Sequence, residues 1–205
     1  MKHSTLLALI VTSSLAQAGN RHQSVSTAPS PAVPEGAEAK GNPPKCRFEA
    51  RGQFLAVYID KKHVQNFPNT EPKSAVAFAT KLANQKDKSG QAQCALPEAS
   101  ELGACSIQPT GAVKTLMLGE KGVKAFSNLD ELSAMAKSYR EAGICSNEES
   151  STPCKLEKKA PNDPTSPLTL TLGGKLYENF NSASEAKARE TLEKLVSAKL
   201  CKYEN

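Results

Sequence analysis

The segment Gly173-Gly174-Lys175 has the residue types of a phosphate-binding loop, because glycines that precede a lysine are typical of loops that cradle phosphate groups. A nucleotide site of that kind needs the pattern GxxxxGK[ST] between a strand and a helix. Here Leu176 follows the lysine, and apolar residues alternate on both sides as they do in strands. The segment therefore fits the turn of a β-hairpin better than a phosphate site.

The other residues with catalytic potential do not form a recognisable set. His63 stands alone in the folded part of the chain, whereas a catalytic triad or a histidine-rich metal site needs partners. The adjacent acids Glu148 and Glu149 fall in a linker, where they fit a solubilising charge run. The cysteines lack CxxC and zinc-knuckle spacings. We therefore expect no catalytic residues, no metal and no cofactor, in a protein that is not an enzyme.

A basic cluster near the start of the folded part is the candidate binding surface. Residues 46–94 contain eight Lys and Arg against four Asp and Glu, which is a local charge of +4. The segment FLAVYI places Phe54, Ala56 and Tyr58 on one face of a strand, and one of its two faces must pack on a helix. An apolar face rimmed by positive charge suits an anionic envelope polymer or an acidic protein. The alternative is that this face packs against the next repeat. The predicted surface comprises Arg47, Arg51, Phe54, Tyr58, Lys61, Lys62 and His63.

The elements that must position these residues occur in three copies. When Phe67, Phe126 and Phe180 are aligned, a lysine lies five places before each phenylalanine and an apolar residue lies three places before it. Large aliphatic residues also match eight and ten places before. A cysteine opens each copy and another closes it, and a helical apolar pattern follows each phenylalanine. The aligned residues are Lys62, Lys121 and Lys175, then Val64, Val123 and Tyr177.

We expect an α+β fold of three tandem disulfide-stapled repeats, each with three antiparallel strands and one helix. Three strands leave the chain at the end opposite its start, and a helix packed across the sheet returns it, so the opening and closing cysteines should meet. This predicts the disulfides Cys46–Cys94, Cys105–Cys145 and Cys154–Cys201. The rival set pairs across the linkers, with Cys94–Cys105, Cys145–Cys154 and Cys46–Cys201.

Local signals predict where the helices and turns lie. Thr70 with Pro72 should start the first helix, Ser127 or Asn128 should cap the second, and Ser182 with Glu185 has capping-box spacing. Gly143 should stop the second helix. The hairpin register stays open at this stage, with a two-residue loop taken to place Leu172 opposite Tyr177.

The chain divides into eight segments. The first has a short charged start, an apolar run and an Ala-Gln-Ala triplet, as secretory signal peptides do, and the second is rich in Pro, Ala and Ser. We predict a signal peptide (1–18), a disordered tether (19–45), repeat 1 (46–94), a linker (95–104), repeat 2 (105–145), a linker (146–153), repeat 3 (154–201) and a tail (202–205).

These features favour an exported protein, periplasmic or extracellular. An even number of six cysteines fits an oxidising compartment, and the lack of any Asn-x-Ser/Thr sequon favours a bacterial source. No segment has the length and apolarity to span a bilayer. Loss of Lys2 with the signal lowers the net charge from +5 to +4, a mild excess that does not indicate nucleic-acid binding. We expect a non-enzymatic binding or scaffold protein, and alternatively an inhibitor of a secreted protease or lysozyme that uses the loop 158–167.

Overall fold

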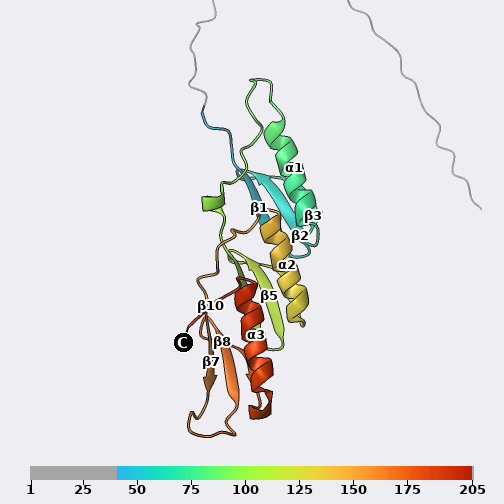
Figure 1. The fold of residues 1–205 in the computed structure, drawn as a ribbon. Coiled ribbons are helices and arrows are strands. Elements are labelled where there is room, and N and C mark those ends of the chain that lie inside the picture. Colours follow the sequence, from blue (N-terminus) through green and yellow to red (C-terminus); the bar gives the residue numbers. More distant parts are fainter. Residues whose placement is uncertain (1–40, 205) are drawn as a thin grey trace, which may run out of the picture. The chain divides into compact units, whose positions relative to one another are not determined.

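The computed structural model describes residues 41–204. The predicted signal peptide and residues 19–40 of the predicted tether lie outside this range. The described chain is a mixed α+β structure with three antiparallel sheets, each followed by a helix that covers one face of that sheet (Figure 1). We call the segments 46–94, 105–145 and 154–201 the first, second and third units.

The same order of three strands and one helix occurs in each unit. The first unit contains β1 (Cys46–Arg51), β2 (Phe54–Ile59), β3 (Lys62–Pro68) and α1 (Pro72–Asn84). The second contains β4 (Cys105–Thr110), β5 (Val113–Leu118), β6 (Lys121–Phe126) and α2 (Leu129–Glu141). The third contains β7 (Pro153–Lys158), β8 (Leu168–Leu172), β9 (Lys175–Phe180) and α3 (Glu185–Ser197), and β10 (Lys202–Tyr203) follows it. Short 3-10 turns lie at Ala99–Glu101 and Ser182–Ser184.

The core of each unit lies between the helix and the inward-facing alternate residues of its sheet. In the first unit Leu55 and Val57 are fully buried together with Ala75 and Ala79 of α1. The helices bury residues spaced i, i+4 and i+7, which is the apolar stripe of an amphipathic helix. These residues are Ala75, Ala79 and Leu82 in α1, Leu132, Ala136 and Tyr139 in α2, and Ala188, Leu192 and Leu195 in α3.

The second and third strands of each unit are joined by a two-residue turn. In the third unit Gly173 and Gly174 form this turn with φ of 55° and 75°, which is a left-handed conformation that glycine adopts without strain. Leu172 therefore pairs with Lys175, so the predicted pairing of Leu172 with Tyr177 is wrong. Residues that flank a two-residue loop must face each other, and Tyr177 lies two places farther along.

A β-bulge occurs at the same place in each third strand. The pairing register shifts so that Val64, Val123 and Tyr177 have no direct partner on the neighbouring strand. These are the apolar residues found three places before the aligned phenylalanines. A bulge bends its strand and re-aims one side chain, which explains why this position is apolar in all three units.

The disulfides are Cys46–Cys94, Cys105–Cys145 and Cys154–Cys201, the predicted set within the units. In each unit the residue after the closing cysteine donates its backbone N–H to the carbonyl two places before the opening cysteine. The distances are 2.7 Å for Ala95 to Pro44, 3.0 Å for Ser146 to Gly103 and 2.8 Å for Lys202 to Thr152. In the third unit this pairing extends into β10, which is parallel to β7. The third sheet thus has four strands, and the predicted tail 202–205 is wrong in this respect.

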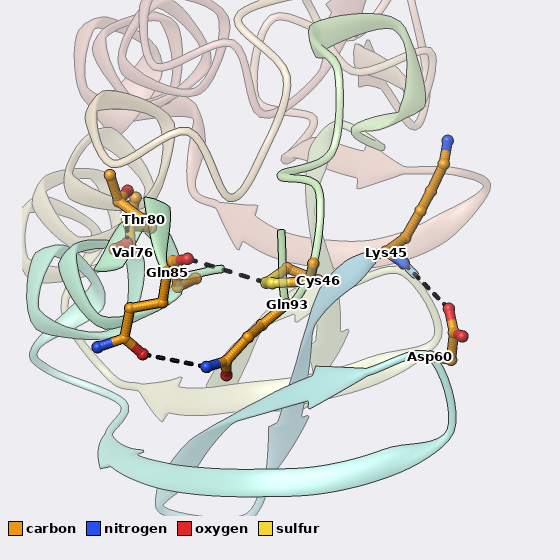
Figure 2. The surroundings of a disulfide bond; sticks show 9 residues. Lys45, Cys46, Asp60, Val76, Thr80, Gln85 and Gln93 are labelled. Atoms are coloured by element: carbon orange, nitrogen blue, oxygen red, sulfur yellow. Dashed lines mark hydrogen bonds between the residues drawn. A yellow bond between two sulfur atoms is a disulfide. The ribbon is translucent and has the colours of Figure 1, made fainter. Parts of the chain in front are cut away.

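Hydrogen bonds on both sides of Cys46 hold the first disulfide in place (Figure 2). The backbone N–H of Lys45 donates to Asp60 Oδ1 at 3.0 Å, which ties the start of β1 to the hairpin turn. Gln93 Nε2 donates to Gln85 Oε1 at 3.3 Å, which holds the segment before Cys94 to the end of α1. Cys46 Sγ lies 3.9 Å from the carbonyl oxygen of Ala79 in α1. The disulfide therefore links the strand, the helix and the closing segment.

The predicted helix starts are correct for α2 only. Asn128 Oδ1 accepts from the backbone N–H of Asp130 at 2.7 Å, and Gly143 follows the end of α2 with φ of 75°. Thr70 does not start α1, because Glu71 occupies the N-cap position and Pro72 is the first helical residue. The capping box of Ser182 and Glu185 is also wrong, because Ser182 lies in a 3-10 turn and Glu185 begins α3.

Candidate functional site

Strand pairing brings five of the seven predicted surface residues together on the outer face of the first sheet. Tyr58 of β2 pairs with Arg47 of β1 and with His63 of β3, and Arg51 pairs with Phe54 in a neighbouring row. Ala56 and Tyr58 are buried but do not belong to the core under α1, so they face away from the helix. We call the surface formed by Arg47, Arg51, Phe54, Tyr58 and His63 the outer face. Lys61 lies in the turn and Lys62 faces Ile59 at the strand edge, so both lie beside it.

Tyr58 lies at the centre of the outer face. The guanidinium carbon of Arg51 lies 5.3 Å from the centroid of its ring, which is a cation–π distance, and the His63 ring meets it edge-on at 5.5 Å. His63 Nε2 is 2.9 Å from Asn66 Oδ1. These neighbours leave Tyr58 only 5% exposed, and its hydroxyl has no hydrogen-bond partner within residues 41–204. A buried unpartnered hydroxyl costs about 1–3 kcal/mol, so Tyr58 is not placed here for stability alone.

The charges on the outer face are only partly compensated. Arg47 donates to the carbonyl oxygen of Asp60 from Nε at 3.0 Å and from Nη2 at 2.6 Å, and this contact fixes the guanidinium without neutralising it. Glu49 lies in the same strand and forms an ion pair with Lys121 of the second unit. It also lies 3.7 Å from Arg51 Nε. Sequence reasoning missed Glu49, although its place between two arginines at i±2 puts it on the same face.

The outer face differs from the same surface of the other two units. Phe54 is 49% exposed, and Arg51 and His63 are exposed beside it. The corresponding rows in the second unit contain Ser106, Gln108 and Thr115, which are uncharged, and Thr169 and Thr171 occupy them in β8. The second unit contacts the first through β1, where Lys121 reaches Glu49, and leaves Phe54 exposed. The alternative prediction, that the next repeat covers this face, therefore fails for Phe54.

The contact between the first and second units is a dry hydrogen-bonded junction that sequence reasoning missed. Asn69 follows β3 and is 7% exposed. Its Nδ2 donates to the carbonyl oxygen of Val123 at 2.7 Å, and its own carbonyl oxygen accepts from the hydroxyl of Tyr139 at 2.8 Å. Burial raises the pKa of Tyr139. We call this set of residues the first junction.

The contact between the second and third units contains a cleft of about 250 Å³, which we call the second junction. Lys114 Nζ lies 4.8 Å from the centroid of the Tyr177 ring, and Lys194 Nζ lies 3.1 Å from Asp130 Oδ1 and 3.2 Å from Glu190 Oε1. Burial, with a smaller effect of the nearby Glu178 carboxylate, raises the pKa of Tyr177 to about 12. The aligned copies contain the signal for this cleft, because Lys114 stands where the other two units have Leu55 and Leu168.

Within residues 41–204 no group of three or more His, Cys, Asp or Glu side chains is placed to hold a metal ion. No helix of the described range is long and apolar enough to cross a membrane. Comparisons of the chain with protein-family models, with curated proteins and with solved structures gave no match.

Proposed function

We propose that this chain is an exported, non-enzymatic binding protein that holds an anionic polymer of the cell envelope on the outer face of its first unit. One observation carries the proposal. Only in the first unit do arginines and a half-exposed aromatic ring share the sheet face opposite the helix, within the part of the chain that the structure describes.

The chemistry of the outer face fits carboxylate or phosphate groups on a repeating chain. An arginine guanidinium can donate two parallel hydrogen bonds to one such group, and Arg47 is held in place by the Asp60 carbonyl before any ligand arrives. Phe54 offers an apolar contact for the backbone of the polymer. Lys61 and Lys62 extend the positive charge past the end of β2 and would attract a long anion.

The disulfides support the exported location within this proposal. Three disulfides use all six cysteines of the chain, and disulfides persist in oxidising compartments. The predicted signal peptide supports the same location. Tandem units stacked by short linkers would hold the first unit away from the point of attachment, as a scaffold does.

Binding to defined anionic polymers tests the proposal. We expect the mature chain to bind fluorescein-labelled polyglutamate or polyphosphate, or to cosediment with purified peptidoglycan, and the binding should weaken as salt rises. The variant Arg47→Glu/Arg51→Glu should lower affinity at least about tenfold. The variant Lys88→Glu/Lys187→Glu makes the same change of charge at two exposed sites elsewhere and should bind normally. Equal losses in both variants, or no binding to any of the three polymers, would overturn the proposal.

The loop between β7 and β8 is the second candidate surface, and its internal hydrogen bonds favour it. The Asp163 carboxylate accepts from the backbone N–H of Thr165 at 2.8 Å and from its hydroxyl at 2.7 Å, and these bonds lower the pKa of Asp163. Ser166 Oγ accepts from the N–H of Ala160 at 2.8 Å. Preorganised loops suit inhibitors of secreted hydrolases. Rate assays with a panel of proteases and lysozymes test this role, and unchanged rates throughout would exclude it.

A further inference from the structure

Each junction between units places the same two elements side by side. Strand β6 of the second unit lies against β1 of the first, and β9 of the third unit lies against β4 of the second. The third strand of each later unit thus faces the first strand of the unit before it. Within the described chain, β3 has no unit before it and β7 has no unit after it.

The apolar residues of β3 are exposed where their counterparts are buried. Val123 and Phe126 in β6 are 2% and 5% exposed, and Tyr177 and Phe180 in β9 are 3% and 4% exposed. Val64 and Phe67, at the same positions in β3, are only partly buried. The ring of Phe67 packs against Phe78 of α1 at 5.4 Å. The edge of the first unit therefore has the apolar residues of a junction without the unit that would cover them.

The charges at the two free ends are complementary in the same register. Lys121, five places before Phe126, pairs with Glu49, three places after Cys46. The equivalent lysine of the first unit is Lys62, and the equivalent acid of the third unit is Glu157. Neither Lys62 nor Glu157 has an ion-pair partner among residues 41–204.

The helices show a second complementary pair. Lys194 near the end of α3 reaches Asp130 at the start of α2. When the buried helix residues are aligned, Lys81 of α1 takes the place of Lys194. The first turn of α3, which would face Lys81 across a further junction of this kind, contains Glu185.

We propose that copies of this chain associate head to tail, with β3 of one copy packed against β7 of another and Lys62 paired with Glu157. Strand β10 does not block this contact, because it pairs only with Pro153 and Cys154. The equivalent parallel bridge between Lys45 and Ala95 leaves room for β6 beside β1. A heterologous contact of this kind leaves one end free on each copy and extends into an open chain unless it closes into a ring. The proposal does not depend on the anionic ligand, because Arg47 and Arg51 lie outside the contact.

Zero-length cross-linking of a mixture of ¹⁵N-labelled and unlabelled protein tests the contact directly. A carbodiimide joins a lysine amine to a carboxylate only when the two groups touch. We expect a heavy–light peptide pair that contains Lys62 and Glu157, and its yield should rise with protein concentration. The Lys121–Glu49 pair is the internal control and should appear only within one copy. Absence of the Lys62–Glu157 pair while the control forms would overturn the proposal.

Charge-swap variants test the same contact in solution by analytical ultracentrifugation. Lys62→Glu and Glu157→Lys should each weaken association about tenfold, and the double variant should restore it. Lys88→Glu removes the same charge from an exposed loop and should associate like the parent protein. A parent protein that stays monomeric at about 1 mM, where even weak contacts are populated, would contradict the proposal. Association that survives in both single variants would also contradict it, since another surface would then be responsible. Polyglutamate binding by Glu157→Lys should be unchanged, which separates this proposal from the proposed function.

Discussion

The two junctions between units use equivalent positions for different purposes. In the first junction Asn69, two places after Phe67, bridges to the Val123 carbonyl, and Tyr139 completes the contact. In the second junction Asn128 has the same position after Phe126 but caps α2 within its own unit, and Leu195 stands where Tyr139 would be. A polar residue can satisfy only one set of partners, so the asparagine that caps a helix is lost to the junction.

The outcome is a closed junction on one side and a cleft on the other. Helix α1 begins five residues after its phenylalanine and α2 begins three residues after, so Asn69 stays in a loop whereas Asn128 is drawn into the helix start. Lys114 then lies over Tyr177 in the space that remains. The comparison shows that a two-residue difference in helix start decides whether neighbouring units are hydrogen-bonded or hollow.

The largest effect should come from removing the disulfide of the second unit, which takes part in both junctions. Replacing Cys105 and Cys145 with serine opens a loop of 40 residues and should cost about 4 kcal/mol of unfolding free energy. Cys145 follows the segment that holds Tyr139, so we expect hydrogen exchange to quicken at both junctions. Removing Cys154–Cys201 should affect only the second junction. Equal exchange at the first junction in both variants would contradict this division.

Asn69→Ala should destabilise the chain more than Asn128→Ala. The first substitution removes the bond to the buried Val123 carbonyl and should cost about 2–3 kcal/mol in denaturant unfolding. The second removes an exposed helix cap and should cost about 1 kcal/mol. Equal costs would show that the two asparagines do equivalent work.

Tyr139→Phe should cost about 1 kcal/mol, because its hydroxyl donates across the first junction. Tyr58→Phe is the matched control. It removes a buried hydroxyl that has no partner in the described chain, so it should leave stability unchanged or raise it slightly. Thermal unfolding of both variants measures the difference, and a larger loss for Tyr58→Phe would reverse the assignment.

Lys114→Leu should stabilise the chain by about 1 kcal/mol, because the side chain would match Leu55 and Leu168 and fill apolar space beside Tyr177. Lys124→Leu, on the exposed part of the next strand, should have little effect. A loss of stability in Lys114→Leu would show that the contact between the lysine and the ring outweighs the filled volume.

Alkaline pH should weaken the second junction, although nothing changes near neutrality. The pKa of Tyr177 is raised from its ordinary value of 10.0 to about 12. A raised pKa favours the folded state below pH 10 and withdraws that stability as pH rises from 10 to 12. Absorbance at 295 nm should show a late tyrosine titration that disappears in Tyr177→Phe. A Tyr177 that titrates near pH 10 would contradict its burial.

Much of the fold follows from local pattern. The aligned phenylalanines, lysines and cysteines were sufficient to predict the strand order, the helices and the disulfide pairs, because each depends on neighbours within about 50 residues. The prediction was wrong for Thr70, for the box of Ser182 and Glu185, and for the partner of Leu172. Cap and turn details depend on one or two residues, and tertiary contacts override their weak preferences.

The candidate site was only partly visible in the sequence. Alternation along β2 was sufficient to place Phe54 and Tyr58 on one face, and pairing with β1 and β3 added Arg47, Arg51 and His63. Glu49 and the unpartnered hydroxyl of Tyr58 appeared only when neighbouring side chains were in place.

The sequence by itself determined the three units, their stapled cysteines and the alternation that separates core from surface, because periodicity and spacing act within a unit. Only the tertiary structure decided how one unit meets the next. The choices between Asn69 as a bridge and Asn128 as a cap, and between Lys114 and an aliphatic residue, depend on groups 50 or more residues apart. Such contacts depend on three-dimensional fit and leave no periodic trace in a single chain.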